Sequence, residues 1–135
     1  KKCMQQIKDL PQNIRVEYYG DIEQVKVEKA LLHSHIFILP SKSENFGHAI
    51  FEALSAGRPV ITSNYTPWKY LQHSKAGINA ETEIISLQNA INSFALMEQA
   101  EYNLWSKNAS EYAASAINLG EIKKQYKNMF TLQND

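Results

Sequence analysis

The sequence lacks the features that mark secreted, membrane-spanning or nucleic-acid-binding proteins. Cys3 is the only cysteine, so no disulfide can form within the chain. No apolar run approaches the roughly 20 residues of a membrane-spanning helix, and the first residues do not have the pattern of a signal peptide. Lys and Arg number 14 together, as do Asp and Glu, so there is no basic excess for nucleic acid. We therefore expect a cytoplasmic protein with no nucleic-acid partner.

The histidines do not form a set of metal ligands. His33 and His35 stand beside an expected buried strand, and His48 and His73 lie far along the chain from them. We therefore infer no metal site and no cofactor.

The length of 135 residues, with 44% hydrophobic residues, allows one sizeable core and is too short for two ordinary domains. We expect one domain over residues 1–135. Residues 1–10 resemble a helix already under way, with no initiator methionine and no cap before it. This start leads us to expect a piece of a longer protein.

Apolar segments alternate with helical patterns in the first part of the chain. Residues 14–19, rich in β-branched and aromatic residues and stopped by Gly20, predict a short strand. Residues 21–34 have apolar residues near helical spacing and predict a half-buried helix. The apolar run 36–39, closed by Pro40, is typical of a central parallel strand covered on both faces.

The alternation continues as far as residue 80. Residues 48–55 predict a helix that ends at Gly57, and residues 60–62 predict the next strand. Residues 66–71 predict a short helix with Thr66 as its N-cap, and residues 77–80 predict a short edge strand. The sequence therefore predicts an α/β fold with a Rossmann-like parallel sheet flanked by helices.

The last part of the chain is helical only. Apolar residues three or four apart predict two amphipathic helices that pack on the sheet, at residues 84–97 and 102–116. Asn118 and Glu121 resemble a capping box, which predicts a last helix beyond them.

The stretch from Pro40 to Ser63 has the clearest functional pattern, since it combines a strand, a loop and a helix start. Such a helix directs the positive end of its dipole toward the crevice above the sheet, where open α/β sheets bind ligands. Gly47 removes a side chain where a ligand must approach the backbone. We expect a diphosphate to rest on the amides of Gly47, His48 and Ala49.

Two carboxylates flank this helix start. Glu44 lies in the loop, and Glu52 lies about one and a half turns into the helix. A carboxylate can accept two hydrogen bonds from a vicinal diol, so both residues suit a nucleotide sugar. Taken singly, each also fits a purely structural role as a solvated loop or surface helix residue. Their place at the end of a buried strand favours a site.

These residues stand inside a longer pattern, P-S-x-x-E-x-F-G-x-x-x-x-E-A-x-x-x-G-x-P-V-I, over residues 40–61. Two glutamates with seven residues between them in this setting resemble the signature of the family 4 retaining glycosyltransferases. V-E-Y-Y-G at residues 16–20 and I-F-I-L-P-S at residues 36–41 match the family order. The resemblance implies the carboxyl-terminal, donor-binding half of a GT-B fold, with a helical carboxyl-terminal region.

The resemblance also implies roles for single residues. Glu52 would hold the ribose hydroxyls, and Glu44, the catalytic candidate, would contact the donor sugar near the reacting centre. Ile22 would border the nucleotide base. Further donor contacts would come from the turn between the glutamates: Asn45, Phe46, Gly47, His48 and Ala49.

The implied activity is transfer of a sugar from a nucleotide diphosphate donor, UDP or GDP, to an acceptor hydroxyl with retention of configuration. The glycan or lipid-linked acceptor would sit on an amino-terminal domain outside this sequence. Cell-surface polysaccharide or lipopolysaccharide synthesis is the expected setting, with peripheral membrane association of the whole enzyme. The chain alone is expected to be inactive.

The sequence departs from the family pattern in two places. Relatives hold the diphosphate with an Arg and Lys pair from a first strand-helix unit, which this sequence does not contain. They often carry Gly-Gly-x-x-Glu after the G-x-P-V-I strand, where this sequence has residues 64–69, N-Y-T-P-W-K. Lys69 would either supply part of the missing charge or be a solvated helix lysine.

Two alternatives stay open. The chain could be a non-catalytic nucleotide-binding or protein-interaction module, which would not depend on a sugar nucleotide. It could also belong to a sugar-phosphate epimerase of the same GT-B fold, which would convert the sugar nucleotide without an acceptor.

Overall fold

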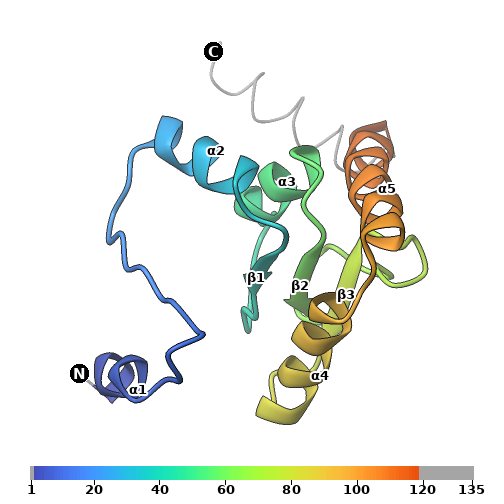
Figure 1. Cartoon of the computed structure of the whole chain (residues 1–135). Coiled ribbons are helices and arrows are strands. Elements are labelled where there is room, and N and C mark those ends of the chain that lie inside the picture. Colours follow the sequence, from blue (N-terminus) through green and yellow to red (C-terminus); the bar gives the residue numbers. More distant parts are fainter. Residues whose placement is uncertain (1, 119–135) are drawn as a thin grey trace.

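The computed structural model describes residues 2–118, which surround one small parallel sheet (Figure 1). The strands are β1 (Phe37–Leu39), β2 (Val60–Ser63) and β3 (Gly77–Ala80), in the order β1-β2-β3. Both pairings are parallel, with Phe37 opposite Val60 and Val60 opposite Gly77. The predicted α/β class is confirmed.

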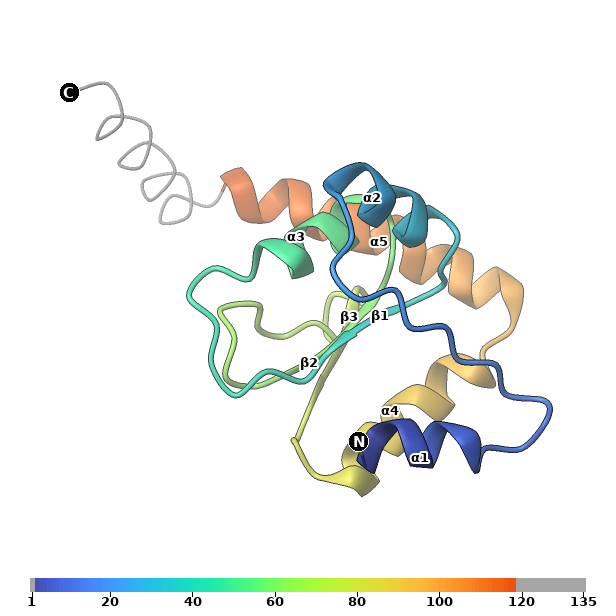
Figure 2. The ribbon, with the colours of Figure 1, turned by 90° about the vertical axis from the view of Figure 1, so that its left-hand side faces the viewer.

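The predicted long helices are also present within the described residues. They are α1 (Lys2–Lys8), α2 (Gln24–Leu32), α3 (His48–Ser55), α4 (Ile84–Ala95) and α5 (Gln99–Asn118). Figures 1 and 2 place α2, α3 and α5 on one side of the sheet and α4 on the other. The last helix predicted beyond Asn118 lies outside the described residues.

The alternation of side chains along β2 separates the core into two parts. All four β2 residues are buried, and neighbouring side chains in a strand point to opposite faces. Val60 packs with Leu54 and Trp68 beneath α3 and α5, whereas Ile61 packs with Ala90 and Phe94 of α4. The sheet is therefore covered on both faces, as a parallel sheet requires.

Helix α5 packs on α3, and its buried alanines join Val60 of β2 in the same core cluster, as expected for a late helix that covers the sheet. Its contact face is lined with small residues, because Ala109, Ala113 and Ala116 are all buried. At the end of α3, Gly57 has φ 74° and its carbonyl accepts a hydrogen bond from Ser106 Oγ at 2.7 Å. Gly57 therefore ends α3 as predicted and contacts α5 closely.

The prediction of a strand at residues 14–19 is wrong for this structure. The segment has no regular secondary structure, and Tyr18 and Tyr19 are 81% and 64% exposed. Figure 1 shows the segment running apart from β1. β-branched and aromatic residues favour a strand, but a strand forms only where a neighbouring strand completes the hydrogen bonds.

The prediction that residues 36–39 form a central strand is also wrong. Among the described strands β1 lies at an edge, and β2 is the central one. Ile38 is 39% exposed as a consequence. An unbroken apolar run indicates burial on both faces, but it carries no information about which edges are paired.

The short helix predicted for residues 66–71 is absent, since residues 66 and 67 form a bend, residues 68–70 are irregular and a turn begins at residue 71. Trp68 N–H donates to Thr66 Oγ1 at 3.3 Å, as at a helix start, but no helix follows. Instead, the side chain of Asn79 in β3 forms hydrogen bonds with backbone groups of this segment. Its amide donates to Ser63 O at 3.2 Å and to Trp68 O at 2.8 Å, and its Oδ1 accepts from Leu71 N–H at 2.9 Å.

Among the described helices, none combines the length and the apolar character needed to cross a membrane.

Replacing Asn79 with Ala should lower the free energy of unfolding by about 2–3 kcal/mol, because part-buried backbone groups of the turn lose their partners. Urea denaturation measures this change. The matched control is Asn103→Ala on the exposed face of α5, which should change stability by less than about 0.5 kcal/mol. Equal effects of the two substitutions would contradict the role assigned to Asn79.

Candidate functional site

The candidate site lies where β1 and β2 reach their carboxyl ends and α3 begins. Thr62 Oγ1 donates to Leu39 O at 2.7 Å, and Ser63 Oγ donates to Ser41 O. These bonds tie the two strand ends together. The loop that leaves β1 is therefore anchored at its base before it turns into α3.

Gly47 sits at the N-cap of α3 with φ 75° and ψ 58°, in the left-handed region that side chains other than glycine's rarely enter. Its carbonyl accepts the first helical bond, from Phe51 N–H at 3.1 Å. A side chain at this α-carbon would be crowded, since an added Cβ would lie 3.1 Å from Trp68 Nε1 and 3.2 Å from Ile50 Cδ1. The backbone at Gly47 is thus packed on one side by an indole ring.

An aromatic cluster holds the turn before the helix. The Phe46 ring lies 4.7 Å from the His48 ring, 6.0 Å from Phe51 and 5.5 Å from Trp68, between centroids. Trp68 Nε1 donates to Phe46 O at 2.6 Å. Trp68 is 2% exposed and belongs to the core, but its sequence position carries no signal for this hydrogen bond.

Glu52 faces α2. It is partly buried and accepts a hydrogen bond from Gln24 Nε2 at 3.1 Å. Both side chains line a hollow of about 390 Å³ between α2 and α3, together with Glu28 and Leu31. The sequence does not indicate a role for Gln24, because it reaches Glu52 only through the packing of two helices.

The other predicted site residues are spread around this helix start. Glu44 is partly buried and Asn45 is exposed, and within residues 2–118 no hydrogen bond joins Glu44 to Glu52. Ile22 lines a separate hollow of about 400 Å³ with Tyr19 and one face of α2. That hollow shares no residue with the one beside Glu52. The structure therefore groups residues 46–48 and leaves Ile22 apart from Glu52.

Lys69 is not a helix lysine, because its Nζ donates to Asn64 O within the turn after β2. The carbonyl of Lys69 accepts a hydrogen bond from the Tyr112 hydroxyl of α5 at 2.7 Å. Burial raises the pKa of Tyr112, which favours the protonated hydroxyl that donates this hydrogen bond. The turn is thus attached to α5 as well as to Asn79.

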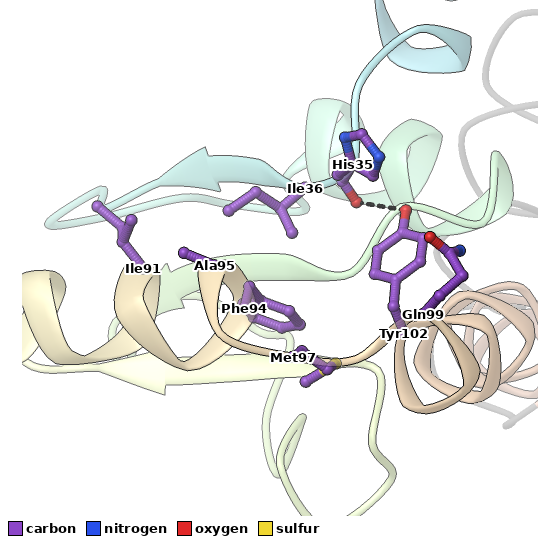
Figure 3. Close-up of a pocket in the computed structure, with 8 residues that line it drawn as sticks. All are labelled: His35, Ile36, Ile91, Phe94, Ala95, Met97, Gln99 and Tyr102. Carbon is purple, nitrogen blue, oxygen red and sulfur yellow. Dashed lines mark hydrogen bonds between the residues drawn. The ribbon is translucent and has the colours of Figure 1, made fainter. Parts of the chain in front are cut away.

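A further hollow of about 360 Å³ lies at the amino end of β1, between that strand, α4 and the start of α5 (Figure 3). His35 O accepts a hydrogen bond from the Tyr102 hydroxyl at 2.7 Å, and the two rings lie 5.4 Å apart. Apolar side chains such as Phe94 and Met97 make up much of the wall. The hollow is at the opposite end of β1 from Glu44. Within the described residues, no group of three His, Cys, Asp or Glu side chains could hold a metal ion.

The sequence of the chain also matches a known family. Residues 1–112 match the family model described as Glycosyl transferases group 1. A comparison with curated proteins found no match.

Among solved structures, a sucrose-phosphate synthase from Thermosynechococcus elongatus matches with a TM-score of 0.69 and 24% sequence identity. The match covers 97% of this chain and 34% of that one. The likeness shows that the sheet and its helices have the fold of part of a GT-B glycosyltransferase.

Replacing Gly47 with Ala should cost about 1–2 kcal/mol of stability, because the left-handed backbone strains an L-residue. The new methyl group should also displace the Trp68 ring. Trp68 fluorescence, read in a Trp105→Phe background, should therefore shift. The control Gly57→Ala has the same backbone strain, with φ 74°, but its methyl would meet Ser106. Trp68 emission that does not differ between the two variants would contradict the packing of Trp68 on Gly47.

Proposed function

The chain belongs to the Glycosyl transferases group 1 family, and from this membership we propose that it binds the nucleotide-sugar donor of a retaining sugar transfer. The observation that carries the proposal is the start of α3. Gly47 brings a helix N-terminus to the carboxyl ends of β1 and β2, where a diphosphate meets the positive end of the helix dipole.

In this proposal the two glutamates bind different parts of the donor. Glu52 accepts hydrogen bonds from the ribose diol. Gln24 donates a hydrogen bond to one oxygen of the Glu52 carboxylate and so restricts the rotation of that side chain. Glu44 contacts the transferred sugar near the reacting carbon. The turn from Asn45 to Ala49 contacts the sugar and the diphosphate, and Ile22 borders the base.

The chemistry follows from where charge develops. The acceptor hydroxyl attacks from the side of the leaving group, so that its oxygen bonds to the sugar carbon as the bond between that carbon and the diphosphate oxygen breaks. The hydroxyl proton passes to the departing diphosphate. Negative charge grows on the departing diphosphate, where the α3 dipole and backbone amides stabilise it. The proposal includes no covalent nucleophile and needs no metal ion.

The whole protein, in this proposal, has an amino-terminal domain that holds a glycan or lipid-linked acceptor. The chain covers only 34% of the matched synthase, which supports a longer parent. The parent acts in cell-surface polysaccharide or lipopolysaccharide synthesis at the inner face of a membrane, with a UDP or GDP sugar as donor. The chain alone is inactive, because the acceptor domain and the basic pair for the diphosphate are missing.

An incomplete sheet also supports a longer parent. Phe37 N–H donates to Pro59 O at 3.0 Å, so the next amide along β1, that of Ile38, points away from β2. No described strand accepts from that side, and Ile38 is 39% exposed. We propose that a strand of the first strand-helix unit pairs there in the whole protein.

Titration with UDP, GDP and ADP, followed by backbone amide shifts, tests the donor site. One nucleotide should give saturable shifts around residues 47–52. Glu52→Ala should weaken that affinity roughly 10- to 100-fold, because hydrogen bonds to a charged group are lost. The control Glu101→Ala removes an exposed glutamate from the first turn of α5 and should leave the affinity unchanged.

The whole protein then separates the alternatives. Consumption of the sugar nucleotide only when an acceptor is present supports the transferase. Conversion without an acceptor indicates the epimerase, and absence of nucleotide binding in the whole protein indicates an interaction module.

Hydrogen exchange tests the open edge of β1. The Ile38 amide should exchange rapidly in this chain and at least about tenfold more slowly in the whole protein, since a paired strand protects it. The Phe37 amide, already bonded to Pro59 O, is the internal control. Equally fast exchange of Ile38 in both forms would show that no strand pairs with this edge.

A further inference from the structure

We propose that Trp68 is a positioning residue for the donor site, which it serves by fixing the direction of the Phe46–Gly47 peptide. The inference rests on the proposed function, since it concerns the amides that would hold the diphosphate. Trp68 does not contact the donor in this proposal; it acts through the peptide that it binds.

The hydrogen bond from Trp68 Nε1 to Phe46 O, at 2.6 Å, sets the orientation of that peptide. The described residues contain no cis peptide bond, and in a trans peptide the C=O and N–H groups point in opposite directions. Because the carbonyl points at the buried indole, the Gly47 N–H of the same peptide points away from it. This is the amide that begins the proposed diphosphate site.

The same bond strengthens the Gly47 amide as a donor. A peptide whose carbonyl accepts a hydrogen bond is polarised, and its N–H then donates more strongly. The indole, the Phe46–Gly47 peptide and a bound phosphate oxygen would form one continuous chain of hydrogen bonds. A pre-oriented donor of this kind does not have to reorganise when charge develops on the diphosphate.

Trp68 can act in this way because it is itself held from several sides. Its carbonyl accepts from Asn79 Nδ2 at 2.8 Å. Its ring stacks on Phe51 at 6.0 Å and lies 6.1 Å from Tyr112. Gly47 completes the contact, because a Cβ there would lie 3.1 Å from the indole nitrogen. Trp68 is thus held at its backbone by β3 and at its ring by α3 and α5.

The Trp68→Phe variant removes the indole N–H and keeps an aromatic ring. Trp105→Phe is a matched control, because Trp105 Nε1 is buried and has no hydrogen-bond partner within the described residues. The first measurement is the exchange rate of the Phe51 amide, which bonds to Gly47 O at 3.1 Å. We expect roughly three- to tenfold faster exchange in Trp68→Phe and no change in the control.

The second measurement is the affinity for inorganic pyrophosphate, followed by the Gly47 amide shift. We expect roughly three- to tenfold weaker binding in Trp68→Phe, with Trp105→Phe unchanged. Affinity that stays the same in Trp68→Phe would overturn the positioning role. Absence of pyrophosphate and nucleotide binding in the whole protein would count against the proposed function. The Phe51 exchange rate would still decide the role of Trp68 in that case.

The unmodified chain provides a test that needs no variant to fold. The Trp68 indole proton should exchange as slowly as the Phe51 amide, because both are released when the turn opens. An indole proton that exchanges at the rate of an exposed tryptophan would overturn the proposal.

Discussion

The parallel pairing of β2 with both neighbours is the constraint on which the described structure depends. All four of its side chains are buried, so each face must be covered and each edge paired. Val60 packs in the part of the core formed with α3 and α5, and Ile61 packs in the part formed with α4. The same pairing brings the ends of β1 and β2 together, which sets where α3 can start.

The sequence predicted elements well where a single residue or a local repeat determines them. Gly57 ends α3 because its left-handed backbone suits glycine, and the apolar spacing of α4 reflects burial on one face. The motif with Glu44 and Glu52 indicated the family, which the family match confirms. The roles assigned to those two residues remain predictions.

The failures share a physical cause, since each depends on a partner far along the chain. Residues 14–19 have the composition of a strand, but no described strand lies beside them. Residues 66–71 resemble a helix start, yet Asn79 of β3 binds the backbone groups that a helix would use internally. The bond from Trp68 to Phe46 joins residues 22 positions apart, and no local pattern encodes it.

The exposed edge of β1 has a practical consequence for anyone handling the chain by itself. A row of unpaired backbone groups beside an apolar residue such as Ile38 is a template on which a second extended chain can align. Residues 14–19, which have no regular secondary structure and are rich in β-branched and aromatic side chains, are suited to that alignment. Self-association in concentrated samples would then arise from backbone pairing, and charged substitutions at this edge would suppress it more effectively than changes in salt.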